Sequence, residues 1–172
     1  MNFDCHQSIK KILEFNQAPT EQKIQLNIAW GVDRNFMFGA AISMTSVLLN
    51  NKDLHIHFHL FTDYIDADYQ QRIAKLAEQF STNISIYVMD ANGLKVLPSG
   101  HAWSHAMYFR FIAFEYLGEK IDSLLYIDAD VMCKGSLFEL TQIDLGEYVA
   151  AVITDVDDSP ARDIEINKDY FN

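Results

Sequence analysis

The pattern of apolar and polar residues along the chain predicts five β-strands. Segments such as LHIHFHLF alternate between apolar and polar residues, which places the two kinds on opposite faces of a strand. SLLYI is shorter and mostly apolar, as is typical of a strand covered on both faces. The predicted strands cover residues 24–30, 54–61, 83–90, 123–127 and 147–153.

Four other segments have apolar residues at helical spacing. Asp66 is well placed to cap one of these helices, and Gly118 stands where another would end. The predicted helices cover residues 8–15, 36–49, 66–80 and 106–118. Strands that alternate with helices of this length predict an α/β fold with a mostly parallel sheet.

Composition and charge narrow the class of protein. The 172 residues are 49% hydrophobic, which fits one globular domain, and the formal charge is −11. An acidic chain argues against a nucleic-acid partner and favours sites for divalent cations. Cys5 and Cys133 are the only cysteines and suit a reducing cytoplasm, and the first residues lack the pattern of a signal peptide.

The segment LLYIDAD contains the most informative pair of polar residues. A buried strand would deliver Asp128 and Asp130 at its C-terminal end, which is the edge where parallel α/β sheets bind ligands. Two carboxylates at this spacing suit Mg²⁺ or Mn²⁺ completed by substrate phosphates. The alternative is an ordinary turn in which the aspartates cap backbone amides.

The segment GVDRN follows the first predicted strand of the α/β region. Gly31 would let a ligand approach the backbone, and Asp33 and Asn35 could accept hydrogen bonds from a ribose or a base. Taken alone, simple capping of the following helix is the better interpretation. Neither a dinucleotide-binding fingerprint nor a P-loop is present.

Arg110 is the only basic residue in the apolar helix predicted at 106–118, so we expect it to have an acidic partner. That partner is either a structural carboxylate or the acidic pair and a substrate phosphate. If the pair were fully buried, loss of Arg110 would cost about 3–5 kcal/mol of stability.

His55, His57 and His59 share one face of a predicted strand. With no further ligand in view, we interpret them as a polar row that faces solvent rather than as a metal site.

Several segments together resemble the retaining glycosyltransferases of family 8, and in particular the bacterial hexosyltransferases that extend the lipopolysaccharide core. The segments, in order, are WGVDRNFMFGAAISMTSVLLNN, RIAKLAEQ, WSHAMYFRFIAFEYLG, LLYIDADVMCKGSL and DYFN. The resemblance implies the type A nucleotide-sugar glycosyltransferase fold, with a Rossmann-like sheet flanked by helices. It divides the chain into a helical extension at 1–23 and the N-terminal portion of a catalytic domain at 24–172.

The resemblance also implies the reaction and the residues that perform it. The reaction is metal-dependent, retaining transfer of a hexose from UDP-glucose or UDP-galactose to the lipopolysaccharide core. Asp128 and Asp130 match the aspartates that hold Mn²⁺ or Mg²⁺ against the diphosphate, and Arg110 matches an arginine that contacts the donor. The remaining matches are Gly31, Val32, Asp33, Asn35 and Ala129 at the nucleotide, Asp155 near the acceptor, and Asn172 at the donor sugar.

In the family the chain continues beyond this point, with a histidine as third metal ligand and a basic, aromatic tail that meets the membrane. We therefore expect this chain to lack a C-terminal part and to be catalytically incomplete. The resemblance places the full-length protein at the cytoplasmic face of the bacterial inner membrane.

Two alternatives remain open. One is an inactive fragment with residual UDP or metal binding. The other is a phosphatase of the haloacid-dehalogenase type, which also places a DxD motif after an apolar strand. That motif normally lies on the first strand of its fold, whereas several predicted elements precede it here.

Overall fold

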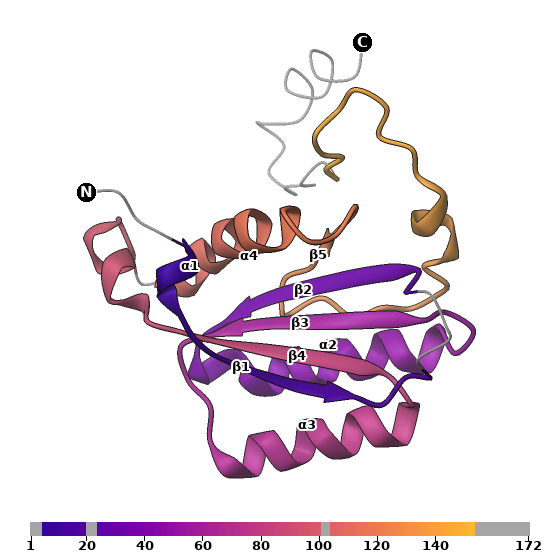
Figure 1. Ribbon diagram of the computed structural model, residues 1–172, viewed down its shortest axis with the longest axis horizontal. Helices are drawn as coiled ribbons and strands as arrows, with labels where there is room; N and C mark the ends of the chain where they lie inside the picture. Colours follow the sequence, from indigo (N-terminus) through magenta and orange to yellow (C-terminus); the bar gives the residue numbers. More distant parts are fainter. Residues whose placement is uncertain (1–4, 20–23, 101–103, 154–172) are drawn as a thin grey trace, which may run out of the picture. The chain divides into compact units, whose positions relative to one another are not determined.

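The computed structural model of the protein describes residues 5–19, 24–100 and 104–153 (Figure 1). Its contacts divide the chain into two units, Met1–Thr141 and Gln142–Asn172. The sheet and all the helices that cover it belong to the first unit. Among the described residues, no helix combines the length and the apolar character needed to cross a bilayer.

A five-stranded sheet with the order β1-β4-β3-β2-β5 forms the centre of the first unit. Four of its strands are parallel to one another, which confirms the predicted mostly parallel α/β fold. They are β2 (Leu26–Val32), β3 (Ile56–Thr62), β4 (Asn83–Met89) and β5 (Leu125–Tyr126), and all four lie within a few residues of the predicted strands.

The helix predicted over residues 8–15 is wrong. A short helix, α1 (Cys5–Ser8), is followed by strand β1 (Ile9–Asn16), which pairs with β4 in antiparallel orientation. Leu13 and Phe15 alternate along β1 and both pack against the main apolar core. Pairing with the edge of β4 therefore outweighs the local helical spacing of the apolar residues.

The strand predicted over residues 147–153 is also wrong. The described part of this segment forms a turn at Gly146, where φ is +55°, and then an irregular stretch. Val149 and Ile153 are almost fully exposed, at 99% and 97%. A strand needs a neighbouring edge, and no described residue pairs with this segment.

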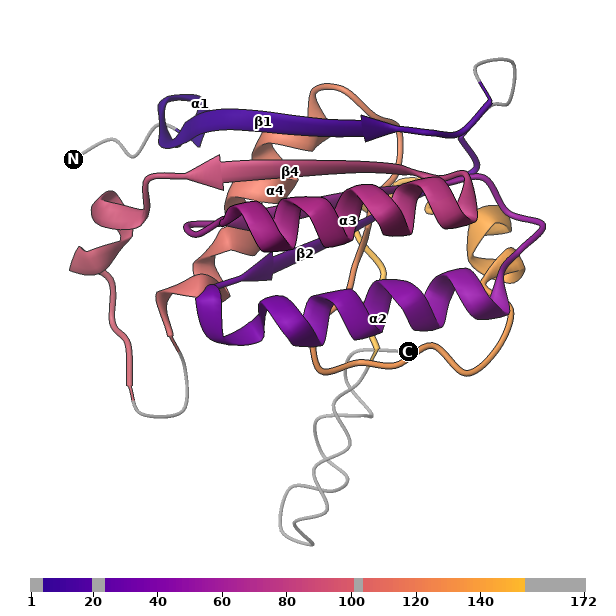
Figure 2. The ribbon, with the colours of Figure 1, turned by 90° about the horizontal axis from the view of Figure 1, so that it is seen from below.

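Helices α2 (Met37–Asn50) and α3 (Ala67–Phe80) lie side by side over one face of the sheet (Figure 2). Both confirm predicted helices, and Asp66 caps α3 as expected by accepting a hydrogen bond from the Tyr69 amide at 2.7 Å. Beneath them the sheet is mainly apolar, with Thr62 as a buried polar exception that contacts Met37 of α2. Its fully buried side chains include Ile28, Trp30, Phe58, Leu60, Ile84 and Ile86.

Helix α4 (Phe109–Gly118) covers part of the other face, with α1 beside it (Figure 1). The predicted helix over 106–118 is confirmed in outline, because a 3-10 turn, η3 (His105–Tyr108), leads directly into α4. Phe109 and Ile112 of α4 pack on Phe61 and Tyr87 of the sheet. This second core is smaller than the first and leaves room for polar residues.

The predicted solvent-facing histidine row is wrong for its last member, His59. His59 is only 2% exposed, because it lies on the face of the sheet that α4 covers. Its Nδ1 lies 3.0 Å from the Tyr87 hydroxyl, and its Nε2 lies 3.2 Å from Asn27 Oδ1. His57 is half-buried and hydrogen-bonds to the Ser85 hydroxyl at 2.8 Å.

Candidate functional site

Asp128 and Asp130 follow β5 at the carboxyl end of the parallel strands, as the sequence predicts. The Ile127 amide donates to the Ala29 carbonyl at 3.1 Å, which extends the pairing with β2 one residue beyond β5. The chain then turns through Asp130, with the Val131 amide donating to the Asp128 carbonyl at 3.1 Å. Both aspartate side chains are exposed.

The alternative in which these carboxylates cap backbone amides finds no support. Within the described part of the chain, no backbone amide donates to the side chain of Asp128 or Asp130, whereas the Asp33 and Asp66 carboxylates do accept such bonds. Among the described residues the side chains of Asp128 and Asp130 therefore have no capping role. Carboxylate oxygens are ligands suited to a hard divalent cation.

Arg110 reaches the acidic pair from α4. Its Nη2 donates to Asp128 Oδ1 at 2.8 Å, and its Nε donates to the Met107 carbonyl at 3.0 Å. The Arg110 and Asp128 side chains are 36% and 56% exposed. The pair is therefore not fully buried, so the condition for a loss of about 3–5 kcal/mol is not met.

Tyr126 is a site residue that the sequence reasoning missed. The Arg110 guanidinium carbon lies 5.0 Å from the centre of its ring, and Phe114 packs against that ring edge-on. Burial raises the pKa of Tyr126 to about 12, so the phenol is neutral. Strand alternation was the available signal, since Tyr126 and Asp128 are two residues apart and share a face.

Gly31 has a packing role at this point of the sheet. A Cβ there would lie 2.7 Å from Phe109 Cβ and 2.7 Å from the Tyr126 hydroxyl oxygen. Glycine is therefore required for α4 and β5 to approach β2 so closely. Protein atoms occupy the space that we expected a ligand to use, and the role of Gly31 toward a nucleotide stays a prediction.

The rest of the GVDRN segment is partly structural. Asp33 caps the 3-10 turn η1 (Arg34–Phe36) by accepting from the Asn35 amide at 2.9 Å, which is the capping role considered above. Val32 is buried in the main core at 1% exposure, so its place at a nucleotide stays a prediction. Asp63, which the sequence reasoning missed, ends β3 at the same edge, and partial burial together with nearby Asp33 raises its pKa.

The turn that contains Asp128 and Asp130 is packed tightly on α2. A Cβ on Gly39 would lie 3.0 Å from the Ala129 carbonyl oxygen. The segment after the turn is tied to the same helix, because the Ser46 hydroxyl accepts from the Cys133 amide at 2.9 Å and Asn51 Oδ1 accepts from the Leu137 amide at 2.6 Å. These contacts hold the backbone around Asp128 and Asp130 against α2.

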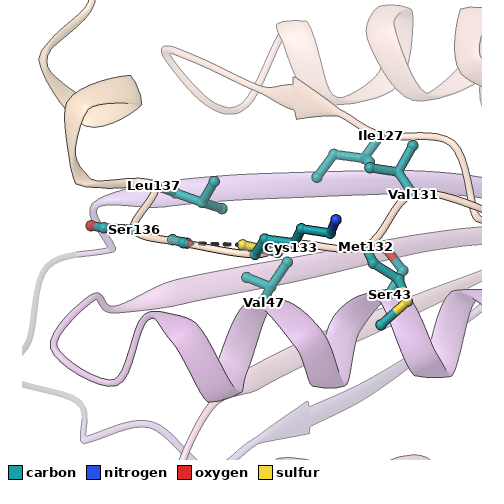
Figure 3. A pocket seen from close by; sticks show the side chains of 10 residues that line it. Ser43, Val47, Ile127, Val131, Met132, Cys133, Ser136 and Leu137 are labelled. Atoms are coloured by element: carbon teal, nitrogen blue, oxygen red, sulfur yellow. Dashed lines mark hydrogen bonds between the residues drawn. The ribbon is translucent and has the colours of Figure 1, made fainter.

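A hollow of about 230 Å³ lies between α2 and residues 131–137 (Figure 3). Its walls are mainly apolar and include Val47, Ile127, Val131, Met132 and Leu137. Within it the Cys133 thiol donates to the Gly135 carbonyl at 3.0 Å. In the described part of its lining Lys134 is the one charged residue and no carboxylate occurs, so the acidic pair outside this hollow is the better site for a diphosphate held by a cation.

The structure does not bring every predicted site residue together. Arg110 and Asp128 are in contact, and Ala129 and Asp130 adjoin them. Asp155 and Asn172 lie outside the described residues. In the described ranges no group of three metal-ligating side chains occurs.

Comparison with known proteins identifies the class to which this fold and edge site belong. The structure of galactosyltransferase LgtC, in complex with donor and acceptor sugar analogs, aligns with a TM-score of 0.60 and 26% identity, over 70% of this chain and 44% of that one. The bifunctional glycosyltransferase WbbM shares the fold, with a TM-score of 0.57 and 21% identity, over 77% of this chain and 23% of that one. The fold is therefore that of a type A glycosyltransferase.

Residues 27–172 match the family described as glycosyl transferase family 8, and the chain belongs to that family. A lipopolysaccharide 1,2-glucosyltransferase of Escherichia coli is 37% identical over 100% of this chain and 53% of its own length. A lipopolysaccharide 1,3-galactosyltransferase of Salmonella typhimurium is 44% identical over 86% of this chain and 44% of its own length. The chain thus spans about half the length of the curated relatives it matches. The family match leaves the phosphatase alternative without support.

Proposed function

We propose that the protein takes part in the transfer of a hexose from a UDP-sugar to the lipopolysaccharide core, with residues 24–172 as the N-terminal portion of the catalytic domain. One observation carries the proposal: a family 8 chain presents Asp128 and Asp130 at the carboxyl edge of its parallel sheet, with Arg110 bound to Asp128. The names of the relatives support lipopolysaccharide as the acceptor class, and they include both glucosyl- and galactosyltransferases. The sugar is accordingly proposed only as a hexose.

Asp128 and Asp130 are proposed to hold Mn²⁺ or Mg²⁺, which their exposed carboxylates suit. When bound, the cation would supply charge compensation for the departing diphosphate. Arg110 carries three further N–H donors suited to a phosphate oxygen. Asp33 and Asn35, together with the backbone of Gly31, Val32 and Ala129, are proposed to contact the nucleoside.

The stereochemical course is proposed as retention. No residue of the described site is placed as an evident covalent nucleophile, so attack by the acceptor hydroxyl on the face that the leaving group departs from fits better than a double displacement. From the family resemblance we also propose that Asp155 lies near the acceptor and that Asn172 lies at the donor sugar. With a lipid-linked acceptor of this kind, the protein would act at the cytoplasmic face of the inner membrane.

Calorimetry with UDP, with and without Mn²⁺, tests the donor and metal assignments. We expect binding that depends on Mn²⁺, and loss of that dependence in Asp128→Asn. Asp53→Asn, on an exposed turn elsewhere in the sheet unit, serves as the matched control and should bind like the parent. Equal affinity for UDP in EDTA would remove the metal from the proposal.

A second candidate function is binding of UDP and metal without transfer. It applies to residues 1–172 tested by themselves, whose described part groups no third metal-ligating side chain with the two aspartates. Transfer of radiolabelled hexose from a UDP-sugar to truncated lipopolysaccharide separates the two candidates.

A further inference from the structure

Three contacts hold the head of Arg110 in one place. Its Nε donates to the Met107 carbonyl at 3.0 Å, its guanidinium carbon lies 5.0 Å from the centre of the Tyr126 ring, and its Nη2 donates to Asp128 Oδ1 at 2.8 Å. A long side chain that is 36% exposed would ordinarily sample many rotamers. Here the backbone of η3 and the ring of β5 orient it before any ligand arrives.

The same carboxylate of Asp128 is needed for a different purpose in the proposed function. A cation bound by Asp128 and Asp130 must take a lone pair of the Asp128 carboxylate, and Arg110 already engages one of its two oxygens. A guanidinium and a divalent cation within a few ångströms of each other also repel. The two therefore compete for one carboxylate.

Asp130 presents the contrast. Among the described residues it forms neither a salt bridge nor a side-chain hydrogen bond, although it lies two residues from Asp128 and is exposed. The cation would meet one engaged carboxylate and one unengaged one. Arg110 thus controls only Asp128.

We propose that Arg110 occupies the position of the cation at Asp128 until the nucleotide and the cation arrive together. The inference rests on the proposed function and deepens it. When a cation takes Asp128, the guanidinium is released while the Tyr126 ring and the Met107 carbonyl keep it at the site. Its freed Nη donors then face the diphosphate that accompanies the cation. The exchange replaces the Arg110–Asp128 ion pair by two favourable charge pairs, one between the cation and Asp128 and one between Arg110 and the diphosphate.

This arrangement predicts opposite signs for two binding constants. Arg110→Met removes the competitor, so Mn²⁺ alone should bind tighter by roughly three- to tenfold, since an exposed ion pair and its repulsion of a cation are each worth only a small factor. The same variant lacks the donors for the diphosphate, so UDP in saturating MnCl₂ should bind about tenfold or more weakly. A merely structural role for Arg110 would weaken both.

The experiment titrates the protein with MnCl₂ and follows free Mn²⁺ by its electron paramagnetic resonance signal, then titrates UDP into the Mn²⁺-saturated protein by calorimetry. Arg110→Met and Arg110→Gln are compared with Arg72→Met, which removes an equally short ion pair, Arg72 to Asp68 at 2.7 Å, on the far face of the sheet unit. Circular dichroism confirms that each variant is folded. We expect the control to match the parent in both titrations.

Unchanged or weaker Mn²⁺ binding in both Arg110 variants overturns the exchange and leaves the proposed function standing. Failure of the parent protein to bind Mn²⁺ at all removes the metal assignment itself, and the exchange with it. Tighter Mn²⁺ binding together with weaker UDP binding is the result that the exchange requires.

Discussion

The two faces of the sheet are built from different chemistry. Under α2 and α3 the strands present mainly apolar side chains, such as the fully buried Trp30, Phe58 and Ile84, with Thr62 as a buried polar exception. Under α4 the same strands present His59, Ser85 and Tyr87 among the apolar residues. A single sheet therefore joins one layer held by apolar packing to one held partly by hydrogen bonds.

The polar layer forms a connected network that reaches the start of β5. Asn27 Nδ2 donates to the Ser123 carbonyl at 3.4 Å, which turns Asn27 Oδ1 toward His59 Nε2 at 3.2 Å. His59 must then donate from Nε2 and accept at Nδ1 from the Tyr87 hydroxyl. His57 lies against His59, with ring centres 4.1 Å apart.

The two layers have different roles: the apolar layer mainly stabilises the fold, and the polar layer helps to set the geometry of the candidate site. The apolar layer supplies non-directional burial, which tolerates adjustment. The polar layer and α4 supply directional contacts to the segment that carries Tyr126 and Asp128. All three residues of the Arg110–Tyr126–Asp128 assembly lie on the α4 side.

The largest expected effect on stability comes from a substitution in the apolar layer. Phe58→Ala removes a fully buried ring that packs 5.5 Å from the Trp30 ring, and it should lower the free energy of unfolding by about 3–5 kcal/mol. Urea unfolding followed by circular dichroism measures the change. Phe38→Ala on α2 is the control, because that ring is 74% exposed and its loss should be nearly neutral.

A change of pH tests the polar layer. Burial, with a smaller contribution from His57, lowers the pKa of His59 from 6.5 to about 3. The unfolded chain then binds a proton that the folded protein refuses, so stability should fall as the pH falls from about 6.5 toward 3. The slope from this group reaches at most about 1.4 kcal/mol per pH unit.

Urea unfolding of the parent and of His59→Gln at several pH values measures this slope. The variant should be less sensitive to pH across the window, whereas His55→Gln, outside the His59 network, should behave like the parent. Parallel pH profiles for His59→Gln and the parent would show that His59 is not the group that titrates.

Gly31→Ala sharpens the contrast where α4 and β5 meet β2. The added methyl would stand 2.7 Å from both Phe109 Cβ and the Tyr126 hydroxyl, so we expect a loss of about 1–3 kcal/mol as α4 is pushed outward. Thermal unfolding checks the value. Gly118→Ala has open space around the new methyl and should not destabilise. Equal melting temperatures for Gly31→Ala and the parent would mean that the close approach is not required.

The smallest effect on stability is expected at the site itself. Arg110→Ala breaks a half-exposed ion pair, so the free energy of unfolding should fall by no more than about 1 kcal/mol. Thermal unfolding of Arg110→Ala is compared with that of Arg72→Ala, which breaks an exposed ion pair on α3 and gives the size of effect expected for such a pair. A loss of several kcal/mol would restore the expectation of a buried pair and contradict the observed exposure.

The position of the acidic pair was readable from the sequence. A run of apolar residues that ends in Asp128 and Asp130 places two carboxylates at the edge of a sheet, whatever surrounds them. Arg110 needed a partner because it interrupts an apolar helix, although its partner had to come from another element. Tyr126 was missed because an aromatic residue in an apolar strand reads as core.

The sequence by itself determined the central strands, α2, α3 and α4, and the position of the acidic pair, because these depend on periodicity and capping within short segments. Only the tertiary structure decided that Ile9–Asn16 is a strand, that residues 147–153 are not, and that His59 is buried. Each of these depends on whether a distant segment supplies an edge or a cover. The contact between Arg110 and Asp128 is of the same kind, since it joins residues 18 positions apart through the packing of α4 on the sheet. Local pattern fixes what a segment can form, and its neighbours in space decide which form it takes.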